Sequence, residues 1–224
     1  MVRTSGGHVP LHVRHSDPIL LTGATGYVGR HLLPALLAAG HDVRALTRDP
    51  SKAALPEDVD ARRGDAVSGD GLAEALAGCH TAYYLIHSMD SEGDFARRDR
   101  AAAHNFGAAA RDAGCERVIY LGGLEGASEH LQSREEVAQI LAGYVPEAVH
   151  ARAAMVIGPG SASFEILRHL VNRLPVMVAP RWIDTRSQPV AIADVVDALV
   201  ALAERGEVPH EVQLGGADVL TYRE

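Results

Sequence analysis

Three evenly spaced glycines follow a short apolar run near the start of the chain. The run covers residues 19–21, and Gly23, Gly26 and Gly29 stand three residues apart directly after it. Glycine leaves room for close backbone approach, and the N-terminus of a following helix offers free N–H groups and a positive dipole end to a phosphate. Because the loop joins a predicted strand to a predicted amphipathic helix, it predicts a dinucleotide pyrophosphate site.

A cation stands where the next predicted strand ends. Arg48 follows the strand predicted at 43–47, about 20 residues after Gly29, where an NAD-specific site places a carboxylate for the ribose 2′-hydroxyl. A guanidinium suits a 2′-phosphate instead, through paired charge-assisted hydrogen bonds, and Arg30 could add to such a site. We therefore expect NADP(H) to be favoured over NAD(H). Asp49 would weaken this expectation if the strand ended one residue later.

Apolar periodicity from residue 18 onward predicts strands that alternate with helices. With right-handed crossovers, this rhythm predicts an α/β, doubly wound parallel sheet, the Rossmann fold. Residues 1–17 are polar and aperiodic and are expected to form a loosely packed arm, whose histidines are solvated rather than metal-bound. The predicted strands are 19–21, 43–47, 61–64, 81–86, 118–121, 149–157, one near 176, and 212–214; the predicted helices are 27–39, 71–76, 94–113, 133–141, 163–173 and 194–205.

Composition narrows the class of protein. The 224 residues are 47% hydrophobic and 22% charged, which excludes disordered and fibrous classes. A formal net charge of −8 argues against nucleic-acid binding through a general basic field. No apolar run approaches the roughly 20 residues of a membrane span, and the start does not resemble a signal peptide. With only Cys79 and Cys115 as cysteines, we expect a cytoplasmic protein with free thiols.

Several motifs resemble those of the atypical short-chain dehydrogenase/reductase superfamily. TGATGYVG at 22–29, RALTRDPSK at 44–52 and the pair Gly64-Asp65 are similar to its NmrA-like members. Segments 82–89, 120–124, 129–134 and 158–168 resemble a bacterial branch of NAD(P)H-binding proteins. The resemblance covers residues 18–224. The chain also resembles, more distantly, the NADPH-binding accessory subunit of respiratory complex I.

The resemblance implies roles for particular residues. A small C-terminal extension would lie on the substrate side, residues 154–163 would cover the nicotinamide, and relatives often pair as homodimers through the helix predicted at 94–113. Residues 215–224 resemble the entry to a further C-terminal domain, so the chain is expected to stop short of one. By position, the pyrophosphate would be lined by Gly23, Thr25, Gly26, Tyr27, Val28 and Gly29, the 2′-phosphate held by Arg48, the adenine by Asp65 and Ala66, and the nicotinamide ribose side by Leu85, Ile86 and His87.

The chain departs from the superfamily's usual catalytic set, a Tyr-x-x-x-Lys motif with an upstream serine. Of its 21 basic residues only Lys52 is a lysine, and it lies far upstream of the expected place. At that place stand His130 and Arg134, with glycines at 122–123 where the serine would be. His130 has the spacing to replace the tyrosine as an acid or base, and Arg134, one helical turn on, could replace the lysine.

Three functions remain open on these residues. The first is an NADP-dependent oxidoreductase that acts on a small substrate, with His130 or His87 as proton donor and a pocket roofed by 161–167 and Trp182. The second is a non-catalytic NADPH-binding module that senses the cofactor ratio or steadies an assembly, which the missing tyrosine, lysine and serine favour. A sugar-nucleotide epimerase or dehydratase is disfavoured, because it normally needs the same tyrosine and lysine.

Overall fold

A seven-stranded parallel sheet forms the centre of the computed structural model, which describes residues 17–87, 95–124, 128–161, 164–165, 168–169 and 186–221. Each strand pairs with its neighbours in parallel. The strands, in the sheet order β10-β6-β5-β4-β1-β2-β3, are β10 (Glu211–Leu214), β6 (Glu147–Ala153), β5 (Arg117–Gly123), β4 (Thr81–Tyr84), β1 (Ile19–Thr22), β2 (Val43–Thr47) and β3 (Asp60–Arg63).

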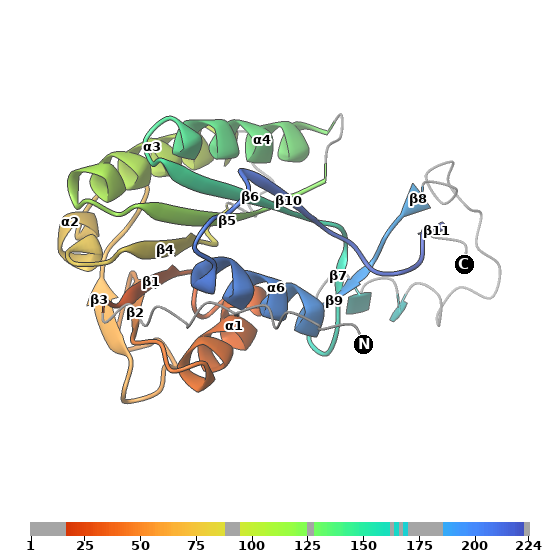
Figure 1. Ribbon diagram of the computed structural model, residues 1–224, viewed down its shortest axis with the longest axis horizontal. Helices are drawn as coiled ribbons and strands as arrows, with labels where there is room; N and C mark the ends of the chain where they lie inside the picture. The colour runs from red at the N-terminus through yellow and green to blue at the C-terminus, as the bar shows by residue number, and fades with distance from the viewer. Residues whose placement is uncertain are drawn as a thin grey trace, which may run out of the picture.

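Helices cover both faces of this sheet (Figure 1). Successive strand residues point to opposite faces, so Leu21 enters the core beneath α1 and α6 while Leu20 enters the core beneath α2, α3 and α4. The expected doubly wound Rossmann fold is therefore confirmed. The helices are α1 (Tyr27–Ala38), α2 (Leu72–Leu76), α3 (Phe95–Asp112), α4 (Glu129–Ala142) and α6 (Ile192–Glu204).

The direction of winding reverses between β1 and β4. From β1 the chain continues outward to β2 and β3, whereas β4 leads to β5, β6 and β10 on the other side. In open α/β sheets, ligands bind in the crevice that opens at the carboxyl ends of the strands at such a point. Here the Thr22 hydroxyl joins the two strand ends, since it donates to the Tyr83 carbonyl at 2.9 Å and accepts the Leu85 N–H at 3.0 Å.

Several predicted boundaries were wrong. The strand predicted at 149–157 is two strands, because β6 ends at Ala153 and β7 (Val156–Ile157) pairs instead with β9 (Val190–Ala191). The strand predicted at 81–86 ends at Tyr84. The helix predicted at 133–141 begins four residues earlier, at Glu129, because the Ser128 hydroxyl accepts the Leu131 N–H at 3.3 Å and caps its start.

An antiparallel pair, β8 (Arg186–Ser187) with β11 (Leu220–Thr221), lies beyond the main sheet (Figure 1). Residues 1–16 of the predicted arm lie outside the described residues, as do the strand predicted near 176, Trp182 and most of the helix predicted at 163–173. Among the residues that are described, none of the helices has the length and apolarity that crossing a bilayer requires.

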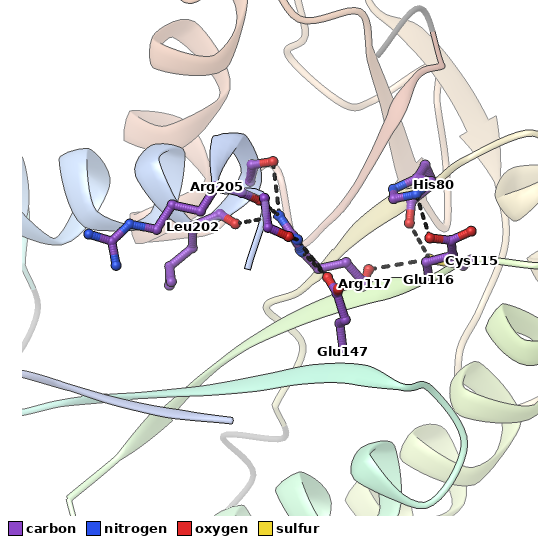
Figure 2. Close-up of polar contacts among 9 residues, drawn as sticks. His80, Cys115, Glu116, Arg117, Glu147, Leu202 and Arg205 are labelled. Carbon is purple, nitrogen blue, oxygen red and sulfur yellow. Dashed lines mark hydrogen bonds and ion pairs between the residues drawn. The ribbon is translucent and has the colours of Figure 1, made fainter. Parts of the chain in front are cut away.

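Buried Arg117, at the start of β5, caps the C-terminus of α6 (Figure 2). Its Nη1 donates to the carbonyl oxygens of Leu202 at 2.9 Å and Arg205 at 2.7 Å, and its Nε donates to Glu147 at 2.8 Å. The last carbonyls of a helix have no partner within the helix, so this guanidinium supplies the missing donors. The contact anchors α6 at the end of the sheet opposite the crevice.

Replacing Arg117 by methionine should lower the free energy of unfolding by about 2–4 kcal/mol, because it leaves the α6 carbonyls and the Glu147 carboxylate without their donor. Urea denaturation measures the change. Arg111→Met is the matched control: Arg111 is exposed and pairs with its neighbour Asp112, so the expected loss is below about 1 kcal/mol. Equal losses in the two variants would contradict a capping role for Arg117.

Candidate functional site

The glycine loop is shaped by backbone contacts that a side chain would block. Gly23 has a φ of +67°, and a β-carbon on it would lie 2.9 Å from the carbonyl oxygen of Leu85. A β-carbon on Gly29 would lie 2.1 Å from the carbonyl oxygen of Gly23. The Gly26 N–H donates to the same carbonyl at 2.9 Å and closes the turn. Glycine at these positions lets the loop, α1 and the end of β4 meet.

The N-terminus of α1 is open toward the crevice. Gly26 precedes the helix without a side-chain cap, and the first turn carries no acidic residue. Thr25 and Gly26 are exposed. The first N–H groups of the helix and the positive end of its dipole are therefore available to an anion, and a pyrophosphate fits this cradle.

Val28 and Tyr27, both predicted to line the pyrophosphate, have side chains that contact different parts of the fold. The side chain of Val28 packs against the core, so only its backbone can serve a phosphate. Tyr27 reaches the segment after β7, since a β-carbon on Gly158 would lie 2.9 Å from its hydroxyl. That hydroxyl is buried, and burial raises its pKa, while the neighbouring Ser161 side chain and the charge of Arg30 oppose the shift. Tyr27 thus connects the glycine loop to the segment predicted to cover the nicotinamide.

Arg48 is exposed directly after β2, and it makes no hydrogen bond or ion pair within the described part of the chain. Asp49 does not compete for it, because its carboxylate accepts from the Ser51 hydroxyl at 2.6 Å and pairs with Lys52 at 3.0 Å. The Ser51 hydrogen bond and then Lys52 hold the pKa of Asp49 below its ordinary value. The guanidinium of Arg48 is left available for an anionic ligand.

The segment after β3 lies beside Arg48. The Gly64 N–H donates to the carbonyl of Thr47 at 2.9 Å, which joins the ends of β3 and β2. Half-buried Asp65 and buried Ala66, the residues expected to hold adenine, follow directly. The fold therefore brings the expected adenine residues and Arg48 to one end of the crevice.

At the other end of the crevice, Leu85, Ile86 and His87 follow β4. Leu85 and Ile86 are half-buried and the His87 side chain reaches the surface. Surrounding protein atoms, which displace water from part of the ring, and the charge of Arg134 lower the pKa of His87, while Asp99 opposes the shift. His87 is therefore neutral near pH 7.

His130 and Arg134 both lie on α4 but face different neighbours. The exposed His130 ring stacks on Phe95, at the start of α3, with centroids 4.2 Å apart. Arg134 lies along the end of β5, since a β-carbon on Gly123 would lie 3.3 Å from its Nη1. Arg134 thus meets the end of β5 and acts on His87, whereas His130 is held by α3.

Gly122, one of the two glycines at the place where the serine was expected, has a buried imidazole against it. A β-carbon on Gly122 would lie 2.2 Å from Nε2 of His150, whose buried ring stacks on Tyr120 with centroids 5.2 Å apart. That Nε2 has no hydrogen-bond partner among the described residues. The sequence analysis missed His150, because no local spacing links a residue in the middle of β6 to a glycine on β5.

The segment predicted to cover the nicotinamide is described in part. Buried Ser161 donates its hydroxyl hydrogen to the Val156 carbonyl at 2.8 Å. Glu165 pairs with Arg168 at 2.6 Å, the solvated helix charge that its position favours. Residues 162–163, 166–167 and Trp182, the rest of the predicted roof, lie outside the described residues.

Comparison with known proteins identifies the family of this chain. A family model described as NAD(P)H-binding matches residues 23–169, which include the glycine loop, Arg48 and the ends of β4 and β5. The chain belongs to this NAD(P)H-binding family. Together with reductase relatives, the match confirms the expected short-chain dehydrogenase/reductase superfamily and the binding of a pyridine nucleotide.

Curated relatives of this NAD(P)H-binding protein are reductases and dehydrogenases. A 4-hydroxy-2-methyl-3-oxo-4-farnesyl-3,4-dihydroquinoline-1-oxide ketoreductase of Stigmatella aurantiaca is 33% identical over 106 residues, which are 45% of this chain and 32% of the relative. A 3-beta-hydroxysteroid dehydrogenase of Mycolicibacterium neoaurum is 29% identical over 112 residues, 46% of this chain and 31% of the relative. The match thus spans about a third of the length of each of these relatives.

Solved structures share the fold of this NAD(P)H-binding protein. An NAD-dependent NDP-hexosamine 5,6-dehydratase of tunicamycin biosynthesis superposes with a TM-score of 0.74 at 21% identity, over 92% of this chain and 78% of that one. A Thermus thermophilus UDP-glucose 4-epimerase complexed with NAD gives 0.73 at 19% identity, over 92% and 80%. At this identity the likeness shows the fold alone.

Restoring a serine at Gly122 should destabilise the protein. Gly122→Ser places a side chain on the His150 ring, so we expect unfolding free energy to fall by about 2 kcal/mol, as in overpacked cores. In the His150→Ala background the same change should cost less than about 1 kcal/mol, because the space is then open. Denaturation of both single variants and the double variant measures this coupling.

Gly206→Ser serves as the control for that cycle, because nothing lies within 4 Å of a β-carbon there. It should leave stability within about 0.5 kcal/mol of wild type. Strictly additive effects of Gly122→Ser and His150→Ala would show that the imidazole does not fill the space beside Gly122.

The titration of His87 should depend on Arg134. Arg134→Gln removes a nearby positive charge that disfavours the imidazolium, so the pKa of His87 should rise toward its ordinary value without reaching it, since lost hydration is the larger cause. NMR titration of the imidazole measures the shift. Arg111→Gln, on the far end of α3, should leave the His87 titration unchanged. An unaltered His87 pKa in Arg134→Gln would refute the electrostatic effect of Arg134 on His87.

Proposed function

We propose that this protein binds NADP(H) in the crevice at the carboxyl ends of β1 and β4 and transfers hydride between it and a small substrate. The observation that carries the proposal is the open N-terminus of α1 behind the glycine loop, with the unpaired Arg48 beside it. The first feature suits a pyrophosphate and the second a ribose 2′-phosphate. The reductase relatives support the oxidoreductase class.

The proposed cofactor contacts follow the order of the strand ends. The loop at 23–29 would hold the pyrophosphate, and Arg48 the 2′-phosphate. Asp65 and Ala66 would hold the adenine. Leu85, Ile86 and His87 would border the nicotinamide ribose, on the side of the crevice formed by β4.

Proton exchange with the substrate is assigned to the imidazoles near the end of β5. A bound nicotinamide cofactor supplies or accepts hydride, so the protein must move a proton at the substrate oxygen. His130 is exposed and its ring plane is fixed by Phe95, which suits proton exchange with an incoming substrate. Arg134 would stand in for the lysine beside the ribose, and neutral His87 would accept a hydrogen bond or a proton.

A non-catalytic NADPH-binding module is the second candidate. The glycines at 122–123 favour it, because neither supplies a hydroxyl to polarise a substrate carbonyl, and a side chain on Gly122 would meet the His150 ring. In this alternative the stacked His130 and Phe95 serve to join α3 to α4. The two candidates differ in NADPH oxidation: an enzyme oxidises NADPH with a carbonyl substrate and slows in His130→Gln, whereas a module only binds it.

The branch of the superfamily, the cellular location, the oligomeric state and the class of substrate are proposed from the sequence. The motifs at 22–29 and 44–52 support the NmrA-like assignment, those at 120–124 and 129–134 support its bacterial NAD(P)H-binding branch, and the cysteine content supports a cytoplasmic location. The exposed side of α3 is the surface on which a homodimer would form. The substrate is a small molecule rather than a nucleic acid, in keeping with the net charge of −8.

Calorimetric titration tests the proposed preference for NADPH over NADH. NADPH should bind at least ~10-fold more tightly than NADH, a gap of about 1.4 kcal/mol, and Arg48→Ala should erase this preference by removing the 2′-phosphate partner. Arg100→Ala, which removes an exposed arginine paired with Glu136 on the far face, should leave the preference intact. If wild-type protein binds neither nucleotide, the glycine loop has only a structural role and the proposal fails.

A further inference from the structure

The segment Asp65–Asp70 after β3 is ordered by its own hydrogen bonds. The Asp65 carboxylate accepts the Val67 N–H at 2.7 Å, its carbonyl accepts the Gly69 N–H at 2.8 Å, and its N–H donates to the Asp70 carbonyl at 2.9 Å. These bonds make a tight loop at the end of the crevice next to Arg48. They also hold one oxygen of the Asp65 carboxylate and leave the other without a partner among the described residues.

Asn105, on α3, also binds this loop through its side chain. The side-chain amide of Asn105 donates to the carbonyl of Ala66 at 3.1 Å and to the carbonyl of Val67 at 2.9 Å. Gly69, with a φ of +86°, packs its Cα side against the same amide. Asn105 is separated from these residues by more than thirty positions in the chain, so only the fold brings them together.

Asn105 and the Asp65 carboxylate bind opposite sides of the same peptide group. The peptide between Ala66 and Val67 is planar and trans, so its carbonyl and its N–H point in opposite directions. Asn105 holds the carbonyl toward α3, and the N–H on the other side therefore points away from α3 to the Asp65 carboxylate. Asn105 thus sets where the Asp65 carboxylate lies, through a single peptide plane.

The loop then presents two groups that match adenine. Within the described residues the Ala66 N–H has no acceptor, and Asp65 keeps a carboxylate oxygen free. A donor beside an acceptor complements the edge of adenine, where N1 accepts a hydrogen bond and the 6-amino group donates one. A ligand that supplied the missing acceptor would satisfy this N–H, which favours binding at this point.

We propose that Asn105 is a positioning residue for adenine recognition: it acts on Asp65 through the Ala66–Val67 peptide and so determines affinity for the adenine half of the cofactor. The inference rests on the proposed cofactor binding. It adds a residue from α3, a helix that contributes none of the expected cofactor contacts. Loss of Asn105 would free the peptide to rotate and release the carboxylate from its place.

A double-mutant cycle tests this assignment. Asn105→Leu should raise the dissociation constant for AMP and for NADPH about 10-fold, and leave that for nicotinamide mononucleotide unchanged. In the Asp65→Ala background Asn105→Leu should raise the AMP constant less than about twofold, because the group through which it acts is gone. Calorimetry on the full chain measures all four proteins.

His104→Ala is the matched control, since it removes a neighbouring α3 side chain and its hydrogen bond to Tyr144 without touching the loop. It should bind AMP as wild type does. Asn105→Asp, which keeps the shape but turns a carboxylate toward two carbonyls, should weaken AMP binding even if the leucine variant does not fold.

The outcomes separate the two proposals. If wild-type protein binds NADPH while Asn105→Leu and Asn105→Asp both retain wild-type AMP affinity, the role of Asn105 is refuted and cofactor binding stands. An equal effect of Asn105→Leu with and without Asp65 would also refute it, since the residue would then act by another route. If wild-type protein binds neither NADPH nor AMP, the proposed function itself fails.

Discussion

The crevice depends on the close approach of backbones where the winding of the sheet reverses. Gly29 lies against the carbonyl of Gly23, and Gly23 lies against the carbonyl of Leu85. The buried Thr22 hydroxyl then joins β1 to the end of β4. These contacts bring the N-terminus of α1 over the strand ends, and a β-carbon at either glycine would push the helix or β4 away. The anion cradle is thus a consequence of how tightly the elements pack.

The two ends of the sheet carry different kinds of polar contact. At the end opposite the crevice, polar groups satisfy one another, as Arg117 does with the α6 carbonyls and Glu147. At the crevice, Arg48 and the start of α1 keep donors without partners within the described residues. Unsatisfied donors at a surface cost little while water reaches them, and they retain their full capacity for a charged ligand. This asymmetry separates the part of the fold that provides stability from the part that provides binding.

The region of the usual catalytic residues has been repacked. His150 fills the space beside Gly122, Arg134 lies against Gly123, and His130 stacks on Phe95. Each replacement is sterically linked to a glycine or to a neighbouring element, so restoring a single residue of the common set would not restore its geometry.

Apolar periodicity and glycine placement predict the Rossmann fold, the glycine loop and most of the strands and helices, because both are local properties of the chain. The sequence also placed Arg48 correctly at the end of β2. Only the packed fold shows what local pattern cannot express: that Val28 packs inward, that His130 is held by Phe95, and that His150 of a neighbouring strand fills the space beside Gly122. The hydrogen bonds of Asn105 to the loop after β3 likewise depend on the packing of the fold. Each of these contacts joins residues distant in the chain, so it exists only once strand order and helix packing bring them within reach.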